Sequence, residues 1–196
     1  MPDKLTPDQA LTQLLRGNER FVAGRPDHPH QSAQRRREVS DTGQQPYAII
    51  LSCADSRVPP EIIFDQGLGD VFVIRVAGNV LDDVILGTIE FAVAQLRTPL
   101  VMVLGHDQCG AIIAAVERVP TNNHVQAVVD ALQPALTLAE AQDGDRVSTA
   151  IDANVRHAVK TLQASEPVLL GASAAGNLRI VGARYNLDTG EVKIMA

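Results

Sequence analysis

Short runs of consecutive apolar residues recur along the chain, separated by longer segments of mixed polarity. Three of these runs predict strands: YAIILSC at residues 47–53, VFVIRVA at 71–77 and PLVMVLGH at 99–106. Because the runs are apolar at successive positions, we expect their strands to form a parallel sheet that is covered on both faces. The C-terminal segment NLRIVGARYNLDTGEVKIMA, residues 177–196, predicts two more strands around an Asp-Thr-Gly turn.

Apolar residues spaced three or four positions apart predict helices before and between the strands. The first helix spans residues 6–21 and is interrupted near Gly17; a second, DDVILGTIEFAVAQLR, spans 82–97. A long helical stretch follows residue 106 and is broken near Pro120 and Pro134, and VRHAVKTLQAS predicts a further helix. This alternation of strands and helices predicts an α/β fold: a central, mostly parallel sheet flanked by helices, with an N-terminal helical arm and a C-terminal pair of strands.

Residues 24–45 form a polar segment with too little apolar surface to fold alone. We expect it to lie on the rest of the fold or on a second subunit. The chain then divides into an N-terminal helix and arm, residues 1–45, and an α/β portion, residues 46–196, within a single domain overall.

Composition narrows the class of protein. The chain is 45% hydrophobic but only 3% aromatic, so its core must be aliphatic. A formal net charge of -6 argues against a nucleic-acid partner, which needs a basic face. The charged N-terminal sequence and the absence of a long apolar segment argue against a signal peptide and a membrane span, and predict a cytoplasmic protein. In that reducing compartment, two cysteines are more typical of metal ligands or catalytic groups than of a disulfide.

The two cysteines stand where two of the predicted strands end. Cys53 is at the end of the first strand, and GHDQCG places His106 and Cys109 at the end of the third and just beyond it. The carboxyl ends of parallel strands open on the same side of a sheet, so these residues can converge. Two thiolates and an imidazole are good zinc ligands, and three protein ligands leave the fourth position open for catalysis. The same residues also fit a second interpretation, in which the cysteines are free thiols packed as small apolar side chains.

The residues around these ligands carry a resemblance to a known family. CADSRVPPEIIFDQGLGDVFVIRVAGNV, GTIEFAVAQL and VLGHDQCGA resemble the β-class carbonic anhydrases, and the resemblance extends from LLRGNERFVAG to VGARYNLDTGEV. It implies one zinc ion per subunit, held by Cys53, His106 and Cys109. It also implies an enzyme that hydrates CO2 reversibly to bicarbonate and a proton by means of zinc-bound hydroxide. Because two thiolates neutralise the zinc charge, we expect activity to rise on the alkaline side of neutrality.

The resemblance also implies roles for the residues beside the first ligand. Arg57 would hold Asp55 in a bidentate pair and so control access to the metal, while in a closed state Asp55 would become the fourth zinc ligand. A structural salt bridge that caps the loop is the alternative interpretation of this pair.

Five further positions match the family's substrate pocket. Gln44 would hydrogen-bond the substrate or product, Gly110 would leave room beside the metal, and an apolar wall for CO2 would comprise Phe72, Ala77 and Phe91. For the two phenylalanines, ordinary core packing is an equally good interpretation. The resemblance places the glutamine and the aromatic wall on the neighbouring subunit, so we expect at least a homodimer, wrapped by the 1–45 arm; a homotetramer is equally compatible.

Other functions are compatible with the same metal ligands. One is a CS2 or COS hydrolase on the same scaffold, and another is a zinc-binding relative without turnover. Nothing in the sequence indicates the narrowed access route that would distinguish the hydrolase, and the intact pair of Asp55 and Arg57, together with Gln44, argues against a relative without turnover. A redox role is disfavoured because the cysteines lack the Cys-x-x-Cys arrangement.

Overall fold

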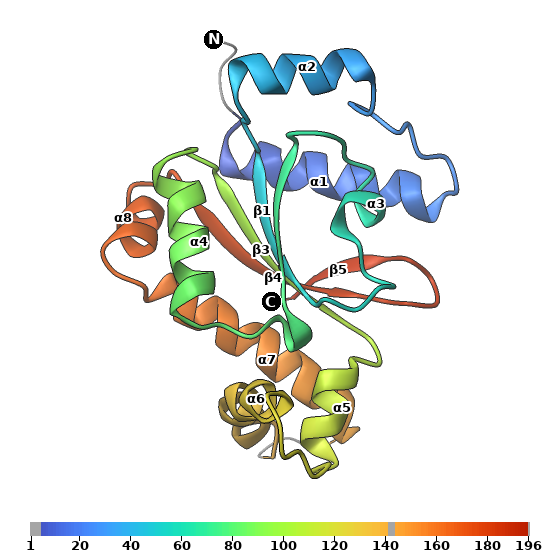
Figure 1. The fold of residues 1–196 in the computed structure, drawn as a ribbon, viewed down its shortest axis with the longest axis vertical. Coiled ribbons are helices and arrows are strands. Elements are labelled where there is room, and N and C mark those ends of the chain that lie inside the picture. Colours follow the sequence, from blue (N-terminus) through green and yellow to red (C-terminus); the bar gives the residue numbers. More distant parts are fainter. Residues whose placement is uncertain (1–4, 141–143, 196) are drawn as a thin grey trace.

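The computed structural model describes residues 5–140 and 144–195, which form a sheet enclosed by helices (Figure 1). The strands are β1 (Ala48–Ser52), β2 (Val71–Arg75), β3 (Leu100–His106), β4 (Arg179–Tyr185) and β5 (Val192–Met195). The helices are α1 (Pro7–Val22), α2 (Ala33–Thr42), α3 (Pro60–Ile63), α4 (Asp83–Ala94), α5 (Gly110–Val116), α6 (Val125–Glu140), α7 (Arg146–Gln163) and α8 (Val168–Ala174), with a 3-10 turn, η1 (Ala77–Asn79).

The sheet has five strands in the order β2-β1-β3-β4-β5. The first four strands in this order are parallel, and only β5 runs antiparallel, beside β4. The prediction of an α/β fold with a mostly parallel sheet is therefore confirmed. This topology brings the carboxyl ends of β1 and β3 together, because the two strands are direct neighbours.

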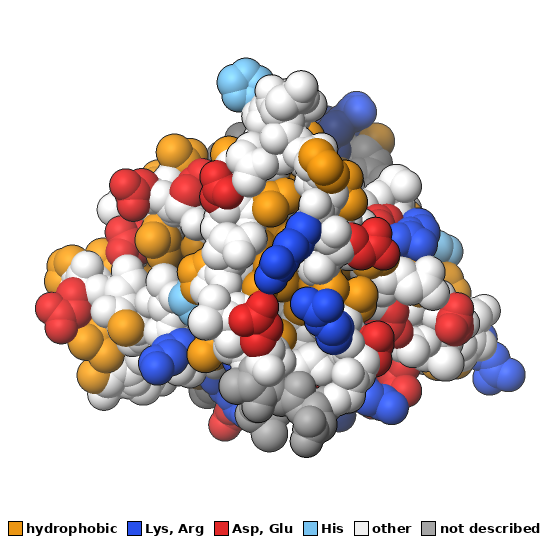
Figure 2. Space-filling view, turned by 90° about the horizontal axis from the view of Figure 1, so that it is seen from below, with side chains coloured by type: hydrophobic (Ala, Val, Ile, Leu, Met, Phe, Trp, Pro, Cys, Tyr) orange, Lys and Arg blue, Asp and Glu red, His pale blue; other side chains and the backbone are white. Residues whose placement is uncertain are grey.

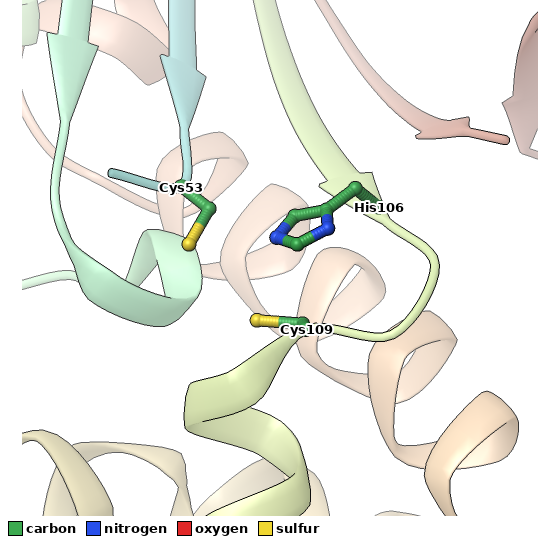
Figure 3. Close-up of side chains that lie close together, drawn as sticks. All are labelled: Cys53, His106 and Cys109. Atoms are coloured by element: carbon green, nitrogen blue, oxygen red, sulfur yellow. The ribbon is translucent and has the colours of Figure 1, made fainter. Parts of the chain in front are cut away.

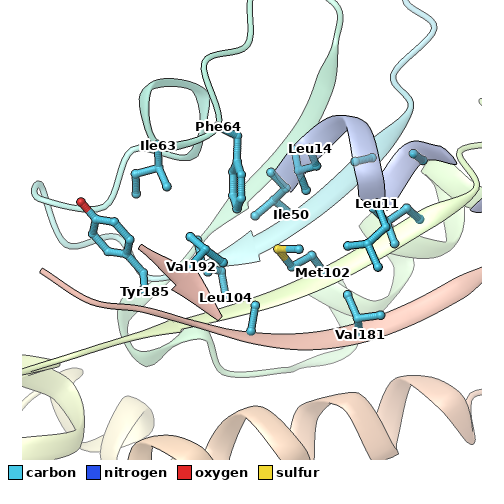
Figure 4. Packing of buried hydrophobic residues seen from close by; sticks show 14 of the residues in the cluster. Leu11, Leu14, Ile50, Ile63, Phe64, Met102, Leu104, Val181, Tyr185 and Val192 are labelled. Atoms are coloured by element: carbon cyan, nitrogen blue, oxygen red, sulfur yellow. The ribbon is translucent and has the colours of Figure 1, made fainter. Parts of the chain in front are cut away.

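Apolar residues cover both faces of the sheet. On one face Ile50 and Met102 pack beneath Leu11 and Leu14 of α1 (Figure 4). On the other face Ile49 packs with side chains from α4, α7 and α8. Successive strand residues point to opposite faces, so burial on both faces explains why the runs are apolar at every position.

The predicted interruption of the first helix at Gly17 is wrong, because α1 continues to Val22. Gly17 instead allows close packing of α1 on the segment after α3. A Cβ atom at this position would lie 1.8 Å from the carbonyl oxygen of Phe64. The glycine is thus required by the approach of two backbones and not by a bend in the helix.

The predicted break near Pro120 is confirmed, since this residue lies between α5 and α6, but the break at Pro134 is wrong, because Pro134 lies inside α6. Its ring is on the exposed face of the helix, where water can replace the missing backbone hydrogen bond. The opposite face, which includes Leu132 and Ala135, is buried and holds the helix in place.

The polar segment after α1 contains a helix that the apolar pattern did not predict. In α2 the side chain of Ser32 caps the first turn, and no residue of the helix is buried. The helix and the segment before it are both fastened to the loop ahead of β2: His30 Nδ1 lies 2.7 Å from Asp70 Oδ1, and Arg35 Nε of α2 donates to the carbonyl oxygen of Leu68 at 3.0 Å. These contacts place the segment against the rest of its own chain, which was one of the two arrangements that we expected. That it also wraps a partner subunit stays a prediction.

Helices α5, α6 and α7 form a third apolar cluster beyond the carboxyl ends of the strands. Figure 2 views the molecule from this end, where acidic, basic and apolar side chains are interspersed. A cavity of about 750 Å³ lies between these helices, and its lining includes neither cysteine nor His106. Within residues 5–140 and 144–195, no helix combines the length and apolarity needed to cross a bilayer.

Candidate metal centre and active site

Two loops bring the three predicted metal ligands together (Figure 3). Cys53 follows the last residue of β1, His106 is the last residue of β3, and Cys109 is the residue before α5. The two sulfur atoms and one imidazole nitrogen all lie within 4.8 Å of one another, and all three residues are buried. The structure therefore favours a metal site over two unrelated free thiols.

The imidazole of His106 is oriented as a metal ligand. Its Nδ1 lies 2.8 Å from the carbonyl oxygen of Asp107, so Nδ1 carries the proton and donates it. Its Nε2 is buried and has no hydrogen-bonding partner among the described residues. Figure 3 shows one ring nitrogen directed toward the two sulfurs. An unprotonated, unpartnered nitrogen in a buried position is a group that a metal ion would satisfy.

The two thiols have strongly different tendencies to ionise. A hydrogen bond from the Cys109 thiol lowers the pKa of Cys53, whose sulfur also accepts from the Gly78 N–H at 3.3 Å. The same contact raises the pKa of Cys109, since a second thiolate would be buried beside the first. A bound dication would relieve this repulsion, and the thiolate is the form in which cysteine binds metal. The donor set of two sulfurs and one nitrogen fits zinc.

Asp55 and Arg57 form a bidentate ion pair beside the cluster. Arg57 Nε donates to Asp55 Oδ1 at 3.0 Å, and Arg57 Nη2 donates to Oδ2 at 2.7 Å. Hydrogen bonds from Arg57 lower the pKa of Asp55 to about 2. Asp55 is outside the cluster of ligand atoms, so the carboxylate stands next to the metal site without closing it.

Two neighbours of Cys53 were missed in the sequence. Arg75 at the end of β2 donates to the carbonyl oxygens of Cys53, at 3.1 Å, and Asp55, at 2.6 Å. Gly78 directs its N–H at the Cys53 sulfur, and Asn154 of α7 donates to the Gly78 carbonyl oxygen at 2.8 Å. The sequence signal was the VIRVAGN segment, residues 73–79, which spans the carboxyl end of β2 and the turn after it, because this end lies beside that of β1.

The predicted pocket residues are not all near the cluster in one chain. Ala77 precedes Gly78, and Gly110 is the first residue of α5, directly after Cys109. Phe72 pairs with Ile49 in the sheet, and Phe91 is 51% exposed on α4.

Gln44 is exposed on the segment that precedes β1. It lies at the amino edge of the sheet, about 15 Å or more from Cys53 along β1. The chain therefore brings Ala77 and Gly110 to its own cluster but not Gln44.

Comparison with known proteins agrees with this geometry. Residues 48–192 match the family model described as carbonic anhydrase. The chain is 46% identical over 188 residues to carbonic anhydrase 2 of Mycobacterium tuberculosis, covering 94% of this chain and 90% of that protein. It is 41% identical over 199 residues to a carbonic anhydrase of Mycolicibacterium smegmatis, covering 99% and 95% of the two chains.

A solved structure gives the same answer for the fold. A tetrameric β-carbonic anhydrase from Sordaria macrospora superposes with a TM-score of 0.75 at 25% identity, covering 84% of this chain and 87% of that one. Sequence, topology and the chemistry of the buried donors agree, and this chain belongs to the β-carbonic anhydrase family as a zinc-dependent carbonic anhydrase.

Proposed function

We propose that Asp55 and Arg57 are the catalytic pair for the reversible hydration of CO2 at the cluster of Cys53, His106 and Cys109. These three residues would hold a zinc ion, which would supply a water activated as a nucleophile near neutral pH. Asp55 is an ionised carboxylate at any such pH, because its pKa is about 2. It can therefore accept a hydrogen bond from the nucleophile and orient it. The observation that carries this proposal is the bidentate pair standing beside an open set of three ligands.

Arg57 has the role of keeping Asp55 off the metal. It uses two side-chain donors on the carboxylate, while its backbone N–H donates to Asp55 Oδ1 at 2.9 Å. The guanidinium also donates to the carbonyl oxygen of Gln108 at 3.3 Å, which ties it to the loop of the other two ligands. These contacts support an open resting state, in which the fourth coordination position is available. Ligation by Asp55 in a closed state would require that Arg57 release both carboxylate oxygens.

The substrate pocket is completed by a second copy of the chain in this proposal. Gln44 lies at the edge of the sheet opposite Cys53 in its own chain, so it can act only on the site of a neighbour. Two exposed apolar residues on α4, Phe91 at 51% and Val84 at 75%, support a surface that a second subunit covers. The minimal functional unit is then a homodimer whose pocket combines Ala77 and Gly110 of one chain with the partner's glutamine and aromatic wall, including Phe72. A tetramer like that of the Sordaria macrospora relative would consist of two such dimers.

The first test is CO2 hydration by stopped flow on protein with a measured zinc content, from slightly acidic to alkaline pH. We expect turnover that rises with pH, because the two thiolates make the zinc a weak Lewis acid. Protein that carries one zinc per chain but has no turnover at any pH would refute the catalytic proposal. A cytoplasmic location stays a prediction, which fractionation of the producing cells would test.

Subunit mixing tests whether the pocket is shared between chains. Gln44→Ala and Asp55→Asn are each expected to impair the homodimer. A heterodimer of the two, purified through different tags, would contain one site with both changes and one site with neither. We therefore expect it to recover about half of the wild-type turnover per dimer. Heterodimers as impaired as the single variants would show that Gln44 does not act across the interface.

A further inference from the structure

Asp107 stands between two zinc ligands in the sequence but directs its side chain away from them, toward β4. Its Oδ1 accepts from Arg184 Nε at 2.7 Å and lies 2.6 Å from Arg184 Nη2. Its Oδ2 accepts from Asn186 Nδ2 at 2.9 Å, and its backbone N–H donates to the carbonyl oxygen of Tyr185 at 3.0 Å. The carboxylate and the amide of this residue are therefore both held by the end of one strand.

The other end of the Arg184 guanidinium is held by α7. Arg184 Nη1 donates to Asp152 Oδ1 at 2.9 Å and to Ser148 Oγ at 2.9 Å. The side chains of Arg184, Asp107 and Asp152 are all partly shielded from solvent, with exposures of 24%, 21% and 30%. A planar guanidinium group that is hydrogen-bonded on both sides holds its partners in a more fixed geometry than the flexible ammonium group of a lysine would.

The carbonyl oxygen of Asp107 connects this network to the metal site. It is the acceptor for His106 Nδ1, which sets the tautomer and the plane of the imidazole. The next residue, Gln108, has a positive φ of 52°, which is unfavourable for a non-glycine residue and persists only where neighbouring contacts impose it. The loop would therefore relax if its anchor were removed, and the carbonyl group would move with it.

We propose that Arg184 is a positioning residue for the zinc site: through Asp107 it holds the loop that presents His106 and Cys109. This inference rests on zinc binding by the cluster, and neither Arg184 nor Asp107 contacts the ligand atoms directly. Removing the guanidinium leaves Cys53, His106 and Cys109 intact but loosens two of them. We therefore expect zinc affinity to fall by the factor that is typical when a residue that hydrogen-bonds a metal ligand is lost.

The test compares Arg184→Gln with Arg179→Gln. Arg179 lies at the other end of β4, where it pairs with Asp8 far from the loop, so it controls for the loss of an arginine–aspartate pair from the same strand. Zinc affinity is measured by competition with a chromophoric chelator, and ligand geometry by the absorption spectrum of the cobalt-substituted protein. We expect Arg184→Gln to weaken zinc binding by roughly 10-fold to 100-fold and to alter the cobalt spectrum. Arg179→Gln should stay within about twofold of wild type.

Thermal melting of the zinc-free and zinc-loaded proteins separates positioning from plain stabilisation. A purely structural arginine would lower both melting temperatures alike and leave the affinity unchanged, because affinity is the difference between the two states. Unchanged affinity in Arg184→Gln would overturn the proposal. If that variant does not fold, the milder Asp152→Ala, which removes only one anchor of the guanidinium, is expected to weaken zinc binding about threefold. In that case an unchanged affinity in Asp152→Ala overturns the proposal. A wild-type zinc protein without CO2 hydration would instead refute the catalytic function and leave the comparison of affinities standing.

Discussion

The two loops that supply the metal ligands are held in different ways. The loop after β1 is held by the pair of Arg57 and Asp55 within it, and half of the Arg57 side chain is exposed. It is also held by Arg75, which donates to the carbonyl oxygens of Asp55 and Cys53, 20 and 22 positions away. The loop after β3 is held by Arg184 and Asn186, which lie 77 and 79 positions away from Asp107 in the sequence. The loop after β1 thus presents polar groups beside the metal site. The loop after β3 is held, on the side away from the metal site, by contacts that fix His106 and Cys109.

This difference separates two tasks that a catalytic metal site must perform. Catalysis needs charged groups that face the open coordination position, a role that we propose for Asp55 and Arg57. Retention of the metal needs ligands whose own rotamers are locked, which the hydrogen bonds around Asp107 provide for His106. Changes in the first loop should therefore affect turnover more than zinc content, unless they remove the ligand itself.

The largest expected effect comes from replacing the one ligand in the first loop. Cys53→Ser removes a thiolate, and zinc affinity should fall by more than about 100-fold, beyond what loss of an outer-shell contact produces. Zinc per chain, measured by elemental analysis after dialysis, should approach zero. Ser56→Ala, an exposed position in the same loop, is the matched control and should retain one zinc. Full zinc content in Cys53→Ser would contradict the ligand assignment.

The next effect tests whether the first loop performs chemistry. Asp55→Asn should retain zinc, because Asp55 is outside the ligand cluster, but lose turnover by roughly 100-fold or more. Stopped-flow kcat together with zinc content checks both expectations, with Asp83→Asn, an exposed position on α4, as the control. A near-wild-type kcat in Asp55→Asn would reduce the pair with Arg57 to a structural salt bridge.

The contribution of the same pair to the stability of the folded protein depends on pH in one direction. The folded-state pKa of Asp55 is about 2, below the ordinary carboxyl value, so its stabilising contribution is present above about pH 4 and is lost as the pH falls toward 2. We therefore expect that a stopped-flow pH profile of the wild-type protein between pH 6 and pH 9 contains no transition from protonation of this carboxylate.

The sequence was most informative where contacts are local. The strands, the three ligands and the Asp55–Arg57 pair follow from short motifs, because each depends on residues a few positions apart or on the shared edge of a parallel sheet. The helix break expected at Gly17 failed because the reason for that glycine is the backbone of Phe64, 47 positions away. The helix α2 was missed because it has no buried face and therefore no apolar period.

The same limit explains what was missed at the site. The sequence predicted Arg184 only as part of a C-terminal strand. Nothing in GARYN indicates that its side chain reaches the loop after His106. The partner of Arg184 becomes evident only when β4 lies beside β3, with Tyr185 opposite His106. Long-range polar contacts have no periodic signature, so positioning residues are harder to predict than ligands.

The smallest expected effect tests one of the contacts that residues at and after the end of β2 make with the first loop. Gly78 donates its N–H to the Cys53 sulfur with a positive φ of 67°, and a Cβ atom there would lie 3.3 Å from the Cβ atom of Ala111. Gly78→Ala should therefore lower the free energy of unfolding by about 1–2 kcal/mol and weaken zinc binding by a smaller factor than Arg184→Gln. Gly171→Ala on α8 is the matched control, since no atom lies within 4 Å of its added Cβ and alanine favours a helix. If Gly78→Ala weakened zinc binding as much as Arg184→Gln, both loops would depend equally on distant contacts, and the contrast between them would not hold.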